Sequence, residues 1–268
     1  MSAATGYVTA LLATMRRDAT IFASYRFRMI SQMLAMLFTM TMFYYIAKLI
    51  RPGATGVHGQ YFAYVVVGMV SFAILTAALN TAQLVRMELV AGTLERMVIS
   101  PLGPVGGVVS IAAFPITYSI CFAGVTLLAA AEVFGFPVRL IGIPPALGVA
   151  ALAAIAFAGI GLLFVAALLA FKAAAGATWV IAGLSILGGV YFPVVLFPGW
   201  IRWVSEVQPF TPALDLLRHL LLGTTPTQSV ALELFKLVAF SLMLIPICAG
   251  ALALAVGLGR RRGTLMEY

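Results

Sequence analysis

Long apolar stretches limit what this chain can fold into more than any other feature of its sequence. Six such stretches follow one another through the 268 residues, separated by polar connections. A helix of about 20 apolar residues crosses the ~30 Å hydrocarbon core of a bilayer, where only helices and closed barrels satisfy their backbone groups. Charged residues make up 9% of the chain, against roughly 25% in soluble domains. The sequence therefore predicts an all-α integral membrane protein with six transmembrane helices.

The predicted spans form a single transmembrane domain, residues 1–268. Residues 30–257 hold the six spans, at 30–49, 61–82, 105–134, 147–171, from about 178 onward, and 233–257. The fifth apolar run meets Gly188, Gly189 and Pro193 soon after it starts, and these residue types break helices. We therefore expect that the fifth run does not continue smoothly, and that residues 258–268 form a cytoplasmic tail.

The first 29 residues predict an amphipathic helix in the membrane interface. Apolar side chains recur at helical spacing there, among them Tyr7, Leu11 and Phe22. Basic side chains share the segment, as expected of a helix at a headgroup surface. The charged residues of this interfacial helix are Arg16, Arg17, Asp18, Arg26 and Arg28.

Basic residues also predict the orientation of the spans. An even number of spans places both termini on one side, and ten of the 16 Lys and Arg fall on that side, including the run 260–262. Cytoplasmic loops carry an excess of Lys and Arg, so we expect both termini in the cytoplasm and a multi-pass protein of the cytoplasmic (inner) membrane. Lipid headgroups explain the net charge of +8, so we expect membrane lipid and no nucleic acid as a partner.

The sequence lacks the common motifs for catalysis or metal binding. No GxxxxGK[ST] run occurs that could cradle nucleotide phosphates, and neither HExxH nor GxSxG is present. Cys121 and Cys248 lie in apolar stretches, where cysteine is typically a small core residue. We therefore predict no catalytic residue, no metal site and no cofactor in this chain.

The polar segment 88–101, after the second span, predicts a short helix on the membrane surface, although composition alone also fits a solvated connector. Its polar and small residues are Glu88, Gly92, Thr93, Glu95, Arg96, Ser100 and Pro101. This pattern resembles the signature of type-2 ABC exporter permeases, the transmembrane subunits of drug, lipo-oligosaccharide and polysaccharide exporters. In that family the segment is the coupling helix, which sits in a cleft of the cytoplasmic ATPase. The resemblance implies that these residues couple the chain to an ATPase subunit.

A second resemblance lies between the fifth and last spans. The segment 189–218 is similar to a proline-rich series of the same family, in which it forms a re-entrant helical hairpin at the outer side of the pore. The matching residues are Pro193, Pro198, Gly199, Trp200, Pro209, Pro212, Asp215 and Arg218. The family has Asn where Gln208 stands, which affects a local turn cap. The segment is too apolar for a solvated loop and too broken to span, which fits a re-entrant hairpin.

Four charged residues in or beside the apolar stretches have structural or proton-transfer interpretations. Asp215 and Arg218 stand three residues apart, so on a helix they share a face, and we expect them to neutralise one another near lipid. Glu132 and Glu233 lie at span ends, where carboxylates reach water. A proton relay through these two residues is therefore an alternative interpretation.

The resemblance implies a transport subunit rather than an enzyme. ATP and magnesium are expected in a separate ABC ATP-binding subunit, present in two copies. Six spans enclose too little surface for a large polar transport pathway, so we expect two permeases to share one. A second copy, in a homodimer, is the simplest choice, and a related second permease is the alternative. The implied cargo is an amphipathic or lipid-linked substrate, such as a drug, a glycolipid or a polysaccharide. Two other classes stay open: an ion- or proton-coupled secondary transporter, and an intramembrane enzyme or assembly factor.

Overall fold

The computed structural model describes residues 3–50, 61–93, 103–171 and 177–261. Every regular element in these ranges is a helix, and they contain no strand. The elements are α1 (Ala3–Ser24), α2 (Arg26–Leu49), α3 (Tyr61–Leu79), α4 (Thr81–Val90), α6 (Gly103–Phe134), η1 (Leu140–Gly142), α7 (Ile143–Phe171), α8 (Ala177–Leu187), η2 (Val194–Leu196), α9 (Gly199–Glu206), α10 (Phe210–Leu222) and α11 (Val230–Arg261). The predicted all-α fold is confirmed.

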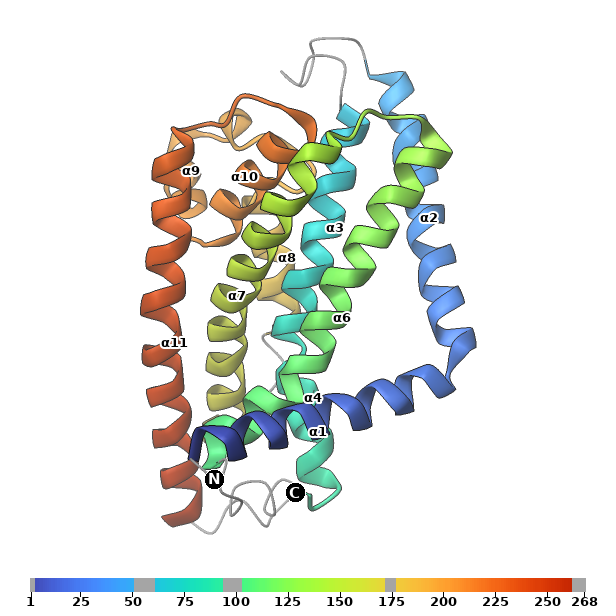
Figure 1. The fold of residues 1–268 in the computed structure, drawn as a ribbon. Coiled ribbons are helices and arrows are strands. Elements are labelled where there is room, and N and C mark those ends of the chain that lie inside the picture. The colour runs from blue at the N-terminus through green and yellow to red at the C-terminus, as the bar shows by residue number, and fades with distance from the viewer. Residues whose placement is uncertain (1–2, 51–60, 94–102, 172–176, 262–268) are drawn as a thin grey trace.

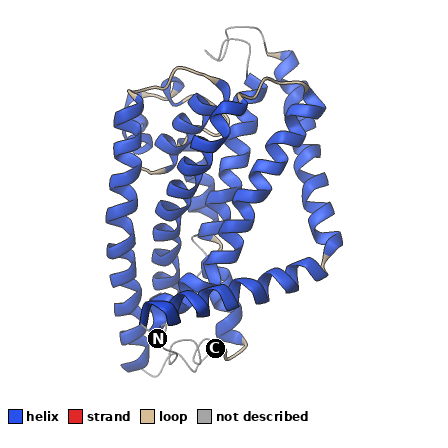
Figure 2. Ribbon diagram, viewed as in Figure 1, coloured by secondary structure: helices blue, strands red, loops and turns tan. Residues whose placement is uncertain are grey.

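Long helices run along one common direction, most of the short elements lie at the two ends of the bundle, and α8 lies between the ends (Figure 1). Helix α1 lies across one end, which also holds α4 and the last turns of α11. Helices α9 and α10 lie at the opposite end. Figure 2 shows that helix accounts for almost all of the described chain, with loops confined to the connections. The bundle thus has an α1 end and an α10 end.

Five helical stretches are long and apolar enough to cross a membrane. They are Arg26–Leu49, Tyr61–Val90, Val105–Phe134, Leu140–Ala170 and Val230–Gly257. The fifth apolar run forms α8, whose 11 residues reach only ~16 Å at 1.5 Å per residue, about half the hydrocarbon thickness. Residues 172–176, just before α8, lie outside the described ranges. The membrane-spanning helices are therefore confirmed, and the count of six stays a prediction.

The N-terminal helix ends earlier than predicted. Helix α1 stops at Ser24, and the chain turns at Tyr25 (φ −103°, ψ 58°) into α2. Arg26 and Arg28 therefore belong to the first turn of the first span helix and not to the interfacial helix. Neither proline nor glycine marks this break. The break coincides with contacts between α1 and α6: the ring centroid of Phe22 lies 4.4 Å from that of Tyr118 on α6.

The second span also passes its predicted end. Helices α3 and α4 meet at Asn80 (φ −70°, ψ −5°), and α4 continues to Val90. Glu88, predicted to begin a separate surface helix, therefore lies in the last turn of α4. An apolar stripe explains this extension, because it buries one face of α4 in a cluster shared with α6, α7 and α11. The stripe consists of Ala82, Val85 and Leu89.

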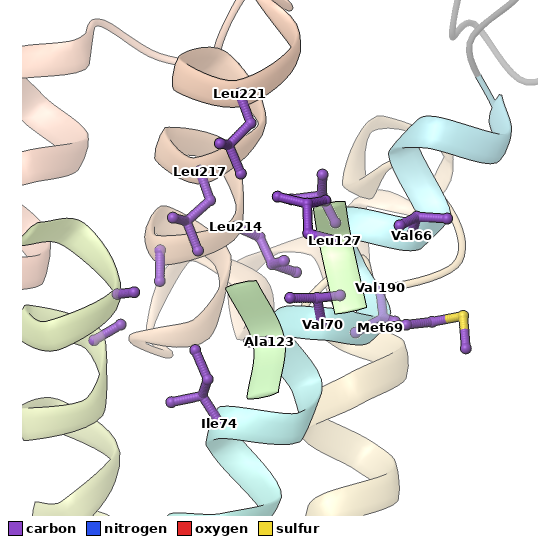
Figure 3. Close-up of a cluster of buried hydrophobic side chains, with 14 of the residues drawn as sticks. Val66, Met69, Val70, Ile74, Ala123, Leu127, Val190, Leu214, Leu217 and Leu221 are labelled. Carbon is purple, nitrogen blue, oxygen red and sulfur yellow. The ribbon is translucent and has the colours of Figure 1, made fainter. Parts of the chain in front are cut away.

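Helix α3 lies at the centre of the hydrophobic core. It is apolar on all sides, and 15 of its 19 residues are buried, which is the pattern of a fully enclosed helix. Figure 3 shows side chains of α3, α6 and α10 meeting in this core. The labelled members are Val66, Met69, Val70, Ile74, Ala123, Leu127, Val190, Leu214, Leu217 and Leu221. This core fixes α10 against α3, and so positions the residues that follow α8.

Helix α7 approaches α3 closely at Gly161. A Cβ atom built there would lie 2.4 Å from the carbonyl oxygen of Ala78, well inside contact distance. We expect Gly161→Ala to lower the free energy of unfolding by about 1–3 kcal/mol, the usual cost of overpacking. Thermal unfolding in detergent measures this. The matched control is Gly148→Ala on the same helix, where a Cβ meets nothing within 4 Å, and equal melting temperatures for the two variants would contradict the prediction.

Candidate functional site

Helix α4 ends in a tight turn at the α1 end of the bundle. Gly92 has φ +68°, the left-handed conformation that glycine adopts at helix ends. The Thr93 amide donates to the Glu88 carbonyl oxygen at 3.0 Å, and the Thr93 hydroxyl contacts the Glu88 carboxylate. Three residues predicted for coupling thus form one compact turn.

An ion pair joins this turn to α1. The Arg17 guanidinium lies 3.7 Å from the Glu88 carboxylate, and 2.8 Å from the carboxylate of Asp18. The side chains of Arg17 and Glu88 are 49% and 23% exposed, so water reaches the pair. The structure therefore brings together residues predicted in two separate regions, the interfacial helix and the coupling segment.

The other residues predicted for the interfacial helix and the coupling segment do not join this ion pair or this turn in the part of the chain that the structure describes. Arg16 on α1 and Arg26 on α2 are exposed. Arg28 lies over the ring of Phe22, with its guanidinium carbon 5.8 Å from the ring centroid. Four residues of the coupling segment lie outside the described residues: Glu95, Arg96, Ser100 and Pro101.

At the α10 end, the residues predicted for a re-entrant hairpin stand where helices begin. A proline is tolerated before or in a first turn, because its missing N–H leaves no helical hydrogen bond unmade. The residues at these starts of η2, α9 and α10 are Pro193, Pro198, Gly199, Trp200, Pro209 and Pro212. Just before α10, the side-chain amide of Gln208 donates to the Thr211 hydroxyl at 3.1 Å. Short helices are thus present where the hairpin was predicted, and their depth in the membrane stays a prediction.

Arg218 of α10 is buried and holds three segments together. Its guanidinium donates to the carbonyl oxygens of Tyr64 at 3.2 Å, Gly189 at 2.8 Å and Val190 at 3.1 Å. Its guanidinium carbon also lies 3.4 Å from the centroid of the Tyr64 ring, a cation–π contact. One side chain therefore ties α10 to α3 and to the turn that follows α8.

The predicted neutralisation of Arg218 by Asp215 does not take the form of a close ion pair. Among the described residues, no ion pair joins these two side chains. Asp215 lines a separate polar cavity of about 150 Å³, with Glu233 and Lys236. The reason is that backbone carbonyl groups around the broken helix α8 satisfy the guanidinium, so Arg218 reaches toward α3 and not along its own helix.

Tyr64 and Gly68 take part in this arginine site but were missed from the sequence. A Cβ atom at Gly68 would lie 2.5 Å from the Val190 carbonyl oxygen and 2.9 Å from a terminal nitrogen of Arg218. Glycine is therefore needed for the close approach of these groups. A single glycine in a span of bulky residues was the available signal.

The sequence of this chain matches a known family. A model of the ABC-2 type transporter family matches residues 8–222, from α1 to the end of α10. This chain belongs to the ABC-2 type transporter family. The resemblance to type-2 ABC permeases that the sequence indicated is thus confirmed. No curated protein matches the chain.

Membership in this family assigns the chain to the membrane subunits of ABC exporters. The permease is therefore a transport subunit and a multi-pass membrane protein, and permeases of this family generally partner with an ATP-binding subunit. Membership favours an exporter permease over a secondary transporter or an intramembrane enzyme. Within the described ranges, no group of three or more His, Cys, Asp and Glu residues is placed to hold a metal ion.

Proposed function

We propose that this permease forms the membrane pathway of an ATP-driven exporter that moves an amphipathic or lipid-linked substrate out across the cytoplasmic membrane. The family supports the exporter class. Apolar, aromatic spans suit a cargo with a hydrocarbon part, such as a drug, a glycolipid or a lipid-carried polysaccharide. ATP and magnesium act in a separate ATP-binding subunit, of which two copies dock at the α1 end. Both termini then lie in the cytoplasm.

The contacts of Glu88 with Thr93 and Arg17 are the observation that carries this proposal. A transmission element must be stiff, because a flexible loop absorbs a partner's movement without passing it on. The turn after α4 is held internally by Thr93 and is linked to α1 by Arg17. Helix α4 is in turn anchored to α6, α7 and α11 through its buried stripe. Movement of the turn would therefore displace the interfacial helix and the spans together.

In this mechanism, ATP binding draws the two coupling segments together and hydrolysis resets them. The segments 88–101 of two permease copies receive that movement and open a shared pathway, by alternating access or as a channel. The protein's own residues supply the stiffness and the docking surface. The chemistry of ATP hydrolysis stays in the partner subunit.

A homodimer is proposed because α2 is poorly enclosed within one copy. Met40 is the buried residue of this helix. Large apolar side chains on α2 face outward, where lipid or a second copy covers them. The most exposed of these are Phe27, Phe38 and Leu49.

Co-purification tests the proposal. Tagged permease extracted from its native membranes is expected to bring with it an ATPase that carries a Walker motif. The double reversal Glu95→Arg with Arg96→Glu is expected to reduce the recovered ATPase roughly tenfold, the effect of losing about 1.4 kcal/mol of binding free energy. The matched control reverses Arg202 and Glu206, exposed residues of α9 at the opposite end, and leaves recovery unchanged. Equal losses in both variants, or no ATPase with the unaltered chain, would contradict docking at this segment.

A further inference from the structure

A large cavity lies beside α1, between the base of α2, the junction of α3 with α4, and α6. Its volume is about 760 Å³, within the range of about 300–1,000 Å³ typical of sites for small ligands. Figure 1 shows α2 separated from α6 near the point where α1 turns into α2, and approaching α6 toward the α10 end. With α1 in the membrane interface, this cavity lies at the depth where lipid headgroups meet hydrocarbon.

One wall of the cavity is a ladder of aromatic rings on α6. Phe114, Tyr118 and Phe122 stand one helical turn apart, and the ring centroids of neighbours are 6.2 and 5.8 Å from one another. Phe22 of α1 adds a fourth ring, 5.7 Å from Phe114 and 4.4 Å from Tyr118. All four side chains line the cavity. Such a wall suits a hydrocarbon chain or a flat ring, because burying it removes apolar surface from water.

Polar groups also line the cavity, and one cation among them has no anionic partner among the residues that the structure describes. Arg17 is already engaged by Asp18 and Glu88. Arg28 lies over the Phe22 ring and forms no ion pair within the described part of the chain. Gln32 also lines the cavity and accepts a hydrogen bond from the Tyr118 hydroxyl at 3.3 Å through its side-chain oxygen, so that bond does not use its amide nitrogen.

We propose that this cavity binds an amphiphile with a phosphate-bearing headgroup, with the phosphate on Arg28 and the hydrocarbon along the aromatic ladder. A guanidinium presents its donors as a planar fork that matches two phosphate oxygens, and the Gln32 amide adds a further donor. The inference goes beyond the proposed export function, because binding requires neither an ATPase nor transport. The ligand is either a phospholipid of the surrounding bilayer or a free phosphate-bearing amphiphile.

Equilibrium binding to the purified permease in neutral detergent, followed by native mass spectrometry, tests this site. The probe is palmitoyl-oleoyl phosphatidylglycerol, and the variant is Arg28→Gln. We expect the affinity for the probe to fall about tenfold, as for the loss of one charge-assisted contact. The matched control is Arg26→Gln, because Arg26 is exposed on the same helical turn but does not line the cavity. An equal loss in both variants, or no loss in Arg28→Gln, would overturn the proposal.

Further probes separate the two parts of the ligand and its two sources. A diacylglycerol with the same acyl chains but no phosphate is expected to bind the unaltered permease about tenfold more weakly. Inorganic phosphate at the same concentration is expected not to displace the phospholipid, and displacement by it would overturn the role of the aromatic ladder. Displacement by dodecyl phosphate would support the site and assign it to free amphiphiles. Retention of the phospholipid against dodecyl phosphate would support the site and assign it to bilayer lipid.

Discussion

Replacing Arg218 by methionine is expected to lower the free energy of unfolding of the permease by about 3 kcal/mol. Each hydrogen bond from a charged donor contributes about 1.5–3 kcal/mol, and a desolvated cation–π contact about 2 kcal/mol. Replacing the charged side chain also removes the free-energy cost of burying its charge, and this offsets part of the loss of stability. Methionine conserves much of the volume, so the loss reports the polar contacts with Tyr64, Gly189 and Val190 and not a cavity.

Thermal unfolding in detergent, followed by circular dichroism, measures the effect of Arg218→Met. Arg218→Lys should recover only part of the stability, because an ammonium group lacks the planar fork that reaches carbonyls on two sides. Arg202→Met is the matched control: Arg202 is exposed and donates to the Val195 carbonyl at 2.6 Å, and we expect a change within about 0.5 kcal/mol. If Arg218→Met unfolded at the temperature of the unaltered permease, Arg218 would not be the anchor of these segments.

Reversing the charge of Glu88 is expected to abolish coupling while leaving the fold intact. Glu88→Lys places a cation beside Arg17 and removes the carboxylate that Thr93 contacts, so the turn loses its links on both sides. We expect the permease-dependent ATPase activity of the reconstituted complex to fall at least about tenfold, on the scale of 1.4 kcal/mol per factor of ten. Stability should change by only about 0–1 kcal/mol, because the ion pair is partly exposed.

A charge exchange distinguishes coupling from a general defect. The double variant Arg17→Glu with Glu88→Arg restores an ion pair of opposite sense, and we expect it to recover a substantial part of the ATPase stimulation. Arg16→Glu, one residue away on α1 and exposed, changes the charge without touching the pair and serves as the control. A failure of the exchange to recover activity, with melting temperatures unchanged, would show that Arg17 does not act through Glu88.

Much of the fold follows from local features of the chain. The apolar length of each stretch predicts the five long helices, because a lipid core demands helices of about that length. Prolines such as Pro198 and Pro209 interrupt the segment predicted as a hairpin, and they stand just before α9 and α10, because proline fixes its own backbone and offers no donor. The pattern in segment 88–101 likewise points to the family, which the match over residues 8–222 confirms.

Contacts between distant residues decided what local features could not predict. The turn at Tyr25 accompanies packing of Phe22 against α6, and neither proline nor glycine marks it. The extension of α4 to Glu88 depends on its apolar stripe against α6, α7 and α11, and Gly92 marks only where that helix ends. Arg218 bonds to a carbonyl group 154 residues away in place of the nearby Asp215. A buried guanidinium bonds where several acceptors lie close together, and only the folded chain brings the carbonyls of α3 and of the turn after α8 to one point.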